Sequence, residues 1–289
     1  MKHFLIYTNK NKDHNLKTTD YIRQYLEQKE QKVSLMVKDA DWKEKSKEDA
    51  LELPTDVDCI IVLGGDGTVL QVVRETAQYH VPIIGVNLGT LGYMTEIEPK
   101  NLDEALGRLI AGDYKQESRM MLTGKIHESG QPDGVKKVEG WALNDIVISR
   151  RGSLQILKFN IYVNGQFLSS YHADGMIVST PTGSTGYNLS AGGPIIEPKA
   201  RLIMLTPICP HSLNRTSIVL SPEDVIEIEI PEGREGRMQA VDANFDGTHT
   251  VQMSTGDKIS IVQSDKIAQF IQLKQESFLK VLHRKLGES

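Results

Sequence analysis

The chain has 289 residues, a length that corresponds to about two domains of ordinary size. Acidic residues outnumber basic residues by 38 to 33, and the formal net charge of −5 argues against a dedicated nucleic-acid binder. Hydrophobic residues make up 39% of the chain, which excludes a long disordered protein.

The N-terminal segment MKHFLIYTNK holds only a brief apolar run, whereas a secretory signal needs roughly 7–15 apolar residues. No stretch of the chain approaches the ~18 apolar residues that span a bilayer. Cys59 and Cys209 both lie in apolar stretches and are expected to be buried, with no disulfide and no cysteine zinc site. We therefore expect a cytoplasmic protein with no membrane partner.

The first half of the chain alternates strand-like and helix-like segments. The charged segment 38–52 is expected to form a loop or a surface helix. Segment 58–63 (DCIIVL) is a nearly continuous apolar run, which is typical of a parallel strand that is buried on both faces. The pattern predicts strands at 3–7, 32–37, 58–63 and 81–86, and helices at 15–29, 69–79 and 102–109. This alternation predicts a Rossmann-like, doubly wound parallel sheet in an α/β domain over residues 1–114.

After Tyr114 the elements become short, β-rich and separated by turns. The Asn164-Gly165 pair between two strand-like segments predicts a tight hairpin. Strands are predicted at 142–148, 155–163, 166–170, 176–179, 216–220, 225–230 and 258–262. This pattern predicts a β-rich, sandwich-like domain over residues 115–274. A C-terminal helix over about 275–289 has one apolar face and is expected to pack back on the first domain.

A glycine-rich motif, Gly64 to Thr68 (GGDGT), follows the strand at 58–63 and precedes a helix. Open α/β sheets bind ligands at this end of their strands, and glycines and a helix N-terminus favour phosphate. The motif has no Walker lysine, and its carboxylate, Asp66, repels phosphate. Asp66 therefore binds phosphate through a metal, accepts a proton from an attacking hydroxyl, or only caps the helix.

A second glycine-rich turn, Asn87 to Tyr93, follows the strand at 81–86. Because parallel strands end at the same edge of a sheet, this turn and the GGDGT motif can form opposite walls of one crevice. Its proposed wall residues are Leu91, Gly92 and Tyr93. The alternative interpretation is an ordinary turn between a strand and a helix.

Two polar motifs lie in the second half of the chain. Asn144 and Asp145 interrupt an apolar strand, and their side chains suit the vicinal hydroxyls of a ribose unless they form a bulge or an edge turn. Segment 172–194 (HADGMIVSTPTGSTGYNLSAGGP) is dominated by small hydroxyls and glycines. In it, Tyr187 can lie along a base and Asp174 can hold a charged or hydroxyl group. The alternative is a long ordered loop with no function.

At these motifs the sequence resembles the NAD kinase family, within the superfamily that also contains the diacylglycerol kinases. The resemblance rests on GGDGT at 64–68, NLGTLGYMTE at 87–96, LND at 143–145, DGMIVSTPTGSTGYNLSAGGP at 174–194 and TPICPHSLN at 206–214. It implies transfer of the γ-phosphoryl group of ATP, or of a phosphoryl group of polyphosphate, to the 2′-hydroxyl of the adenosine ribose of NAD. It also implies a divalent metal, usually Mg²⁺, and a homodimer or homotetramer.

The resemblance further implies roles for single residues. Asp66 matches the general base and also contacts NAD, Asn144 and Asp145 match the pair that holds ribose, and Asp174 matches the residue at the nicotinamide end. The loop that binds the donor phosphates is matched by Gly64, Gly65, Gly67 and Thr68, and Gly67 also adjoins the NAD ribose. The further residues implied around NAD are Thr185, Gly186, Tyr187, Asn188, Leu189 and Ser190, and more weakly Gln155, His172 and Asn244. This chain departs from the family at Gly186, where Ala is usual, and at His172, where Arg or Lys is frequent.

Two other functions compete with this one. A lipid or other small-molecule kinase of the same superfamily would carry a similar GGDGT loop, but it would also show an apolar groove or a basic membrane face, which is not apparent. A non-catalytic NAD-binding sensor would bind the nucleotide without phosphate transfer. The TPTGSTGY segment with Asn144 and Asp145 favours the NAD kinase, and the intact GGDGT motif argues against the sensor.

Overall fold

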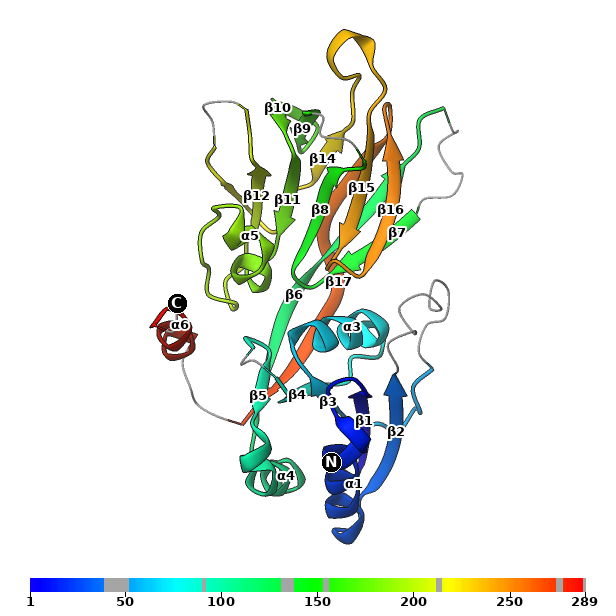
Figure 1. Ribbon diagram of the computed structural model, residues 1–289, viewed down its shortest axis with the longest axis vertical. Helices are drawn as coiled ribbons and strands as arrows, with labels where there is room; N and C mark the ends of the chain where they lie inside the picture. The colour runs from blue at the N-terminus through cyan, green and yellow to red at the C-terminus, as the bar shows by residue number, and fades with distance from the viewer. Residues whose placement is uncertain are drawn as a thin grey trace. The chain divides into compact units, whose positions relative to one another are not determined.

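A computed structural model describes residues 1–38, 52–89, 92–130, 138–152, 156–211, 215–273 and 278–287. The chain divides into two compact units (Figure 1). The first unit is made of Met1–Ser118 together with Ile267–Ser289, and the second is Arg119–Lys266. The second unit is therefore an insertion in the chain of the first. The greater part of the charged segment 38–52 lies outside the described residues.

The first unit contains a parallel sheet. Its strands are β1 (His3–Asn9), β2 (Lys32–Lys38), β3 (Cys59–Gly64), β4 (Ile83–Asn87) and β5 (Thr95–Ile97). Their order is β2-β1-β3-β4, and β5 and the last part of β17 (Lys258–Gln272) pair in parallel with β4. Every residue of β3 and β4 is buried, as expected of central strands covered on both faces.

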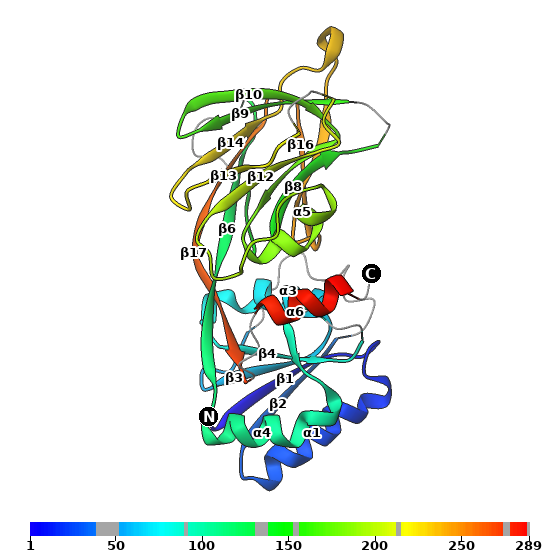
Figure 2. The ribbon, with the colours of Figure 1, turned by 90° about the vertical axis from the view of Figure 1, so that its left-hand side faces the viewer.

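Helices cover both faces of this sheet. They are α1 (Lys17–Gln28), α3 (Asp66–Thr76) and α4 (Leu102–Ala111). The unit also contains α6 (Phe278–Gly287) and short 3₁₀ helices at His14–Leu16, Ala77–Tyr79 and Pro99–Asn101. Helices α1 and α4 pack side by side on one face (Figure 2), where Leu26 and Leu106 join a buried cluster with Ile6. Helix α3 covers the opposite face. Successive side chains of β1 point to opposite faces of the sheet, and Tyr7, next to Ile6, donates its hydroxyl to Glu75 of α3. The predicted doubly wound α/β arrangement is confirmed.

Two helices begin at positions other than those predicted. Helix α1 begins at Lys17 because Asn15 and Leu16 have φ of 59° and 55°, outside the helical region. Helix α3 begins at Asp66, inside the GGDGT motif and three residues before the predicted start at 69. Asp66, Gly67 and Thr68 therefore belong to the first turn of the helix, whereas the sequence predicted a turn that precedes it.

The second unit is built from antiparallel strands. They are β6 (Lys115–His127, which begins in the first unit), β7 (Val138–Ala142), β8 (Asp145–Arg150), β9 (Leu157–Val163), β10 (Gln166–Ala173), β11 (Gly175–Ser179), β12 (Ile203–Ile208), β13 (Ile218–Leu220), β14 (Ile226–Glu229), β15 (Ala240–Phe245), β16 (His249–Ser254) and the first part of β17. One sheet has the order β13-β12-β11-β8-β15-β16, and the other contains β10-β9-β14-β17 with β6 and β7. Short helices lie at Thr182–Thr185, at α5 (Tyr187–Ser190) and at Arg234–Gly236.

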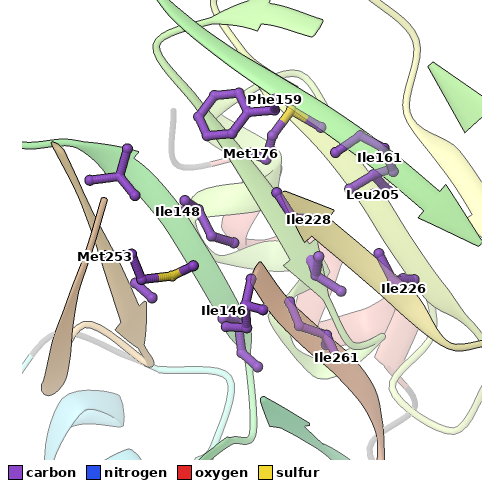
Figure 3. Close-up of a cluster of buried hydrophobic side chains, with 14 of the residues drawn as sticks. Ile146, Ile148, Phe159, Ile161, Met176, Leu205, Ile226, Ile228, Met253 and Ile261 are labelled. Atoms are coloured by element: carbon purple, nitrogen blue, oxygen red, sulfur yellow. The ribbon is translucent and has the colours of Figure 1, made fainter. Parts of the chain in front are cut away.

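The core of the second unit lies between its two sheets. Figure 3 shows Ile146 and Ile148 of β8 meeting Phe159 of β9 and Ile228 of β14 in one apolar cluster. Full burial of such a side chain stabilises a fold by about 1.5–3 kcal/mol. The alternating pattern VIEIEI at 225–230 places its isoleucines in this core, and the sandwich-like prediction is confirmed.

Three local predictions were wrong. The strand predicted at 142–148 is split into β7 and β8, and the strand predicted at 258–262 continues to Gln272. Cys59 is buried as expected, but Cys209 is exposed because it lies one residue beyond the end of β12. None of the described helices has the length and apolar character that crossing a membrane requires.

Candidate functional site

The GGDGT motif forms a tight junction between β3 and α3. A Cβ atom on Gly64 would lie 2.4 Å from Oγ1 of Thr68, so only glycine fits there. Gly65 is the extended residue before the helix, Asp66 is half-buried in the first turn, and Gly67 is exposed. The first N–H groups of a helix have no acceptor within it, so this end of α3 presents donors. The side chain of Asn9, at the end of β1, donates to Thr68 Oγ1 at 3.3 Å.

The carboxylate of Asp66 is held by the second glycine-rich turn. Its Oδ2 accepts the N–H of Tyr93 at 2.7 Å, and its Oδ1 accepts the N–H of Met94 at 3.1 Å. A Cβ atom on Gly92 would lie 1.9 Å from Asp66 Oδ1, so glycine at 92 is what allows this approach. Gly65, not Asp66, is the residue at the helix N-cap, and no side chain caps the helix there. The helix-capping interpretation of Asp66 is therefore wrong.

The two glycine-rich turns are also joined by the N–H of Leu88, which donates to the carbonyl oxygen of Gly64 at 3.0 Å. Within the second turn, the side chain of Asn87 accepts the N–H of Gly89 at 2.9 Å. The ammonium group of Lys285, on α6, lies 4.1 Å from the centre of the Tyr93 ring. Burial and the nearby Asp66 raise the pKa of Tyr93. The predicted wall residue Leu91 lies outside the described residues.

The oxygen atoms at this junction suit a metal ion that is bound mainly by the phosphates of a substrate. Within the ranges that the structure describes, no group of three or more His, Cys, Asp or Glu side chains could hold a metal ion by itself. Mg²⁺ in phosphoryl-transfer sites is usually bound by one or two carboxylates, by water and by substrate phosphates. Each oxygen of Asp66 accepts one N–H group and keeps a further lone pair.

In the second unit, the turn at Asn144 and Asp145 is held by another carboxylate. Asp246, in the connection between β15 and β16, accepts the N–H groups of Leu143 and Asn144 at 2.7 Å each and that of Asp145 at 3.1 Å. These bonds replace strand pairing, so the predicted continuous strand breaks here. The two polar residues mark a sharp turn within the predicted strand.

The structure brings the long polar segment onto this same turn. Thr180 donates its hydroxyl to the carbonyl oxygen of Leu143 at 2.6 Å and its N–H to that of Asn144 at 2.9 Å. A Cβ atom on Gly183 would lie 2.1 Å from the carbonyl oxygen of Asn144, so glycine is required there. A Cβ atom on Gly186 would lie 3.3 Å from the carbonyl oxygen of Gly183, which is a tight contact, and 3.6 Å from Nδ2 of Asn144 and 3.9 Å from Oδ2 of Asp145.

Asn144 and Asp145 are polar groups in a buried setting. Burial and the neighbouring Asp246 raise the pKa of Asp145 to about 7. Oδ1 of Asn144 is buried and has no hydrogen-bond partner among the described residues. Because buried polar atoms normally have partners, this oxygen is a candidate ligand contact.

The residues from 185 to 190 face two ways. The side chains of Tyr187 and Leu189 are 47% and 38% exposed, Ser190 is exposed, and Thr185 is half-buried. Asn188 is fully buried, and its amide group donates to the carbonyl oxygens of Ser184 and Pro194. Oδ1 of Asn188 accepts the hydroxyl of Thr206 at 2.7 Å. The side chain of Asn188 therefore uses these hydrogen bonds to stabilise the loop.

The remaining predicted residues that the structure describes lie on strands of both sheets of the second unit or next to them. Asp174 forms an ion pair with Arg150 at 3.0 Å. His172 is half-buried at the end of β10, and Asn244 of β15 accepts the hydroxyl of Thr250 at 2.6 Å. Gln155 lies outside the described residues. The sequence interpretation missed Asn9, Arg150 and Asp246. Only Asp246 had a usable signal, the Asp-Gly pair of a hairpin turn.

Comparison with known proteins links both units to one family. Residues 4–114 match the family model described as the ATP-NAD kinase N-terminal domain, and residues 143–273 match the ATP-NAD kinase C-terminal domain. The chain is 42% identical to the NAD kinase of Lachnoclostridium phytofermentans over 100% of both chains. It is 44% identical to that of Lachnospira eligens over 99% of this chain and 100% of that one.

Two solved structures resemble this one. The yeast NADH kinase complexed with NADH has a TM-score of 0.83 and 25% identity, and the match covers 99% of this chain and 88% of that one. An NAD kinase from Archaeoglobus fulgidus in complex with ATP has a TM-score of 0.75 and 27% identity, and the match covers 100% of both chains.

Proposed function

Since this chain belongs to the NAD kinase family, we propose that it transfers the γ-phosphoryl group of ATP to the 2′-hydroxyl of the adenosine ribose of NAD and so forms NADP. The observation that carries the proposal is the placement of Asp66. It is a single carboxylate in the first turn of α3, fixed by two N–H groups from a second glycine-rich turn. The ATP complex of the Archaeoglobus relative favours ATP over polyphosphate as the donor.

Asp66 acts as the general base in this proposal. A ribose hydroxyl is a weak nucleophile, and phosphoryl transfer depends mainly on alignment and on neutralisation of charge. The two N–H groups fix the direction of the carboxylate, and its remaining lone pairs are available to a hydroxyl proton. The proton passes from the 2′-hydroxyl to a carboxylate oxygen of Asp66 as the O–P bond forms and ADP leaves.

The glycines of the motif serve the phosphate donor. Gly64, Gly65, Gly67 and Thr68 are proposed to surround the donor phosphates at the positive end of α3, which favours anions. The N–H of Thr68 itself donates to the carbonyl oxygen of Gly65 at 2.9 Å. When bound, Mg²⁺ neutralises charge on the donor phosphates. The protein group available to it in the described part of this loop is Asp66. Gly92 and Tyr93 keep Asp66 in place from the second turn, and Leu91 is proposed as part of the same wall.

The second unit binds NAD in this proposal. The carbonyl oxygen of the Asn144 side chain and the carboxyl group of Asp145 accept or donate hydrogen bonds at a ribose, and Tyr187 offers an exposed ring to a base. Asp174, oriented by Arg150, serves the nicotinamide end. The further proposed contacts are Thr185, Gly186, Asn188, Leu189 and Ser190, and more weakly Gln155, His172 and Asn244.

Two properties of the whole protein belong to the proposal as well. Segments that surround NAD are shared between subunits in the family that this sequence resembles, so we infer a homodimer or homotetramer. Light scattering of the purified protein tests this directly. A cytoplasmic location, where NAD and ATP are both available, is part of the same proposal.

An enzymatic assay tests the function. The purified protein is incubated with NAD, ATP and Mg²⁺, and NADP is followed with an NADP-specific dehydrogenase, with parallel reactions that contain polyphosphate or NADH. The expected result is NADP formation that requires both ATP and metal. Tight NAD binding in calorimetry without NADP from either donor would instead support a nucleotide sensor. Absence of both binding and turnover would contradict the proposal.

A further inference from the structure

The turn between β15 and β16 carries an unusual carboxylate. Asp246 has a φ of 50° and is followed by Gly247 with a φ of 63°, a left-handed pair that Asp and Gly tolerate in tight hairpins. Its two carboxylate oxygens accept three successive N–H groups, from Leu143, Asn144 and Asp145. In return, the N–H of Asp246 donates to the carbonyl oxygen of Asp145 at 3.0 Å.

These bonds shape the turn that displays Asn144 and Asp145. An ionised acceptor makes shorter and stronger hydrogen bonds than a carbonyl oxygen does. Three such bonds to consecutive residues fix the peptide planes on both sides of Asn144, and β8 resumes its strand pairing at Asp145, opposite Ser179. The direction of both side chains therefore depends on Asp246.

Asp246 also acts on the carboxyl group of Asp145 through its charge. Burial is the first cause of the raised pKa of Asp145, about 7, and the charge of Asp246 is the second. Ser179 of β11 is paired opposite Asp145, and a Cβ atom on Gly186, before α5, would lie 3.9 Å from Oδ2 of Asp145. The titratable residue of the Asp246 hairpin is His249, which pairs with Phe245. Near neutral pH the Asp145 carboxyl group holds a proton part of the time and can then donate a hydrogen bond.

We propose that Asp246 is a positioning residue for NAD: its carboxylate fixes the turn at Asn144 and Asp145 and so sets the direction in which both side chains meet a ribose. This inference rests on the proposed function of the second unit as the NAD-binding part. It gives Asp246 an effect on NAD affinity and on the pH dependence of that affinity. It gives Asp246 no part in phosphate transfer.

The substitution Asp246→Asn tests the inference, because Asn tolerates the left-handed conformation but removes the charge and replaces one acceptor oxygen by a donor. We expect the KM for NAD to rise about tenfold, or about 1.4 kcal/mol. The KM for ATP should stay the same, and kcat should change by less than about threefold. In the wild type the dissociation constant of NAD should rise as pH increases through about 7. In the variant this rise should begin at a lower pH.

A second hairpin of the same unit provides the matched control. Asn164 has a φ of 52°, precedes Gly165, and holds its neighbours by accepting the N–H of Val225 and donating to Asp224. The substitution Asn164→Ala removes those bonds from an equivalent turn that does not contact Asn144 or Asp145. It should lower the melting temperature without changing the KM for NAD or its pH dependence.

The experiments test the role of Asp246 separately from the proposed function of the protein. An Asp246→Asn protein with the KM and pH dependence of the wild type would overturn it, as would equal effects in the Asn164→Ala control. If the wild type forms no NADP, the proposed function fails, and calorimetric NAD titrations of the same variants still measure the role of Asp246. If Asp246→Asn does not fold, Asp246→Glu replaces it, because it keeps the charge but moves the acceptor oxygens away from the three N–H groups. A raised KM for NAD with an unchanged KM for ATP then supports the inference, and a wild-type KM for NAD contradicts it.

Discussion

Each unit contains a carboxylate that accepts backbone N–H groups from a neighbouring turn, but the two carboxylates stand in different relations to the proposed chemistry. Asp66 belongs to the motif itself, is half-buried, and uses two N–H groups of another turn to fix its own direction. Asp246 lies outside the motif that it serves and uses three N–H groups to fix Asn144 and Asp145.

This difference between Asp66 and Asp246 corresponds to the difference between phosphoryl transfer and NAD binding. A base must keep lone pairs for the proton that it receives, and Asp66 does so because its two hydrogen bonds are shared between two oxygens. A ribose-binding pair must keep its geometry, which the second unit achieves with a separate carboxylate and a buried, proton-holding Asp145. Substitutions in the first unit should therefore act on kcat, and those in the second on the KM for NAD.

The substitution Asp66→Asn should give the largest effect. Removal of the base should lower kcat by about 10²–10⁴-fold while NAD binding is kept, because general-base contributions have that size. Steady-state kinetics with NAD and ATP measure it. Asp103→Asn, which alters another acidic residue in the first turn of a helix of the same unit, is the control and should retain normal kcat. Near-normal turnover by Asp66→Asn would remove Asp66 from its assigned role.

The substitution Gly92→Ala should come next. Its Cβ atom would lie 1.9 Å from Asp66 Oδ1 and must displace that carboxylate. Displacement of a reacting group by about 1 Å can cost about 100-fold in rate, so kcat should fall by that order. Gly89→Ala in the same turn meets no atom within 4 Å and should leave kcat unchanged. Equal kinetics of the two variants would show that Asp66 needs no space at Gly92.

Two glycine substitutions in the second unit can be compared in the same way, with a smaller expected effect on the kinetics. Gly183→Ala places Cβ 2.1 Å from the backbone of Asn144 and should raise the KM for NAD, because a clash of this kind costs about 1–3 kcal/mol. Gly186→Ala, which restores the residue usual in the family, places Cβ 3.3 Å from the carbonyl oxygen of Gly183, a much milder crowding, and should change the KM by less than about threefold. If Gly186→Ala proves the more harmful, the assigned geometry of this turn is wrong.

Glu75 on α3 offers the smallest and purely structural test. Burial raises its pKa to about 7, the same direction as for Asp145, and Tyr7 and Gln71 contact its carboxyl group. Because the folded protein binds this proton more tightly than the unfolded chain does, stability declines as pH rises from about 4.5 to 7. Glu75→Gln should therefore stabilise the protein at pH 8 by on the order of 1 kcal/mol and have little effect at pH 4.5.

Denaturant unfolding of the Glu75→Gln variant and the wild type at both pH values measures this difference. Kinetic constants should not change at either pH. A stabilisation of equal size at pH 4.5 and pH 8 would mean that the ionisation of Glu75 is not its cause.

Much of this architecture follows from local sequence patterns. Alternation of strands and helices predicted the doubly wound part because each apolar run such as 58–63 is bounded by a turn. The two glycine-rich turns were predicted from their positions at strand ends, and the structure joins them by hydrogen bonds. Asn144 and Asp145 were found as polar residues within an apolar strand and segment 172–194 from its glycines and hydroxyls, and the structure joins these two motifs as well. The start of α3 at Asp66 was missed because glycine has low helix propensity, although it is tolerated in a first turn.

Other features depend on residues far apart in the chain. The break between β7 and β8 is caused by Asp246, about a hundred residues later, and no local pattern at Leu143 contains that information. The length of β17 is set by pairing with β14 and β4 rather than by alternation, so only its first residues were predicted. The pairing of Asp174 with Arg150 likewise requires the register of β8 with β11.

Calorimetric titration of NAD into Asp66→Asn and Asp145→Asn, together with the turnover of both at saturating NAD, tests the division between reaction and recognition most directly. The account predicts that Asp66→Asn binds NAD like the wild type but forms almost no NADP. It predicts that Asp145→Asn binds NAD more weakly but turns over at a rate close to that of the wild type. Loss of NAD binding in Asp66→Asn, or normal binding with lost turnover in Asp145→Asn, would contradict it.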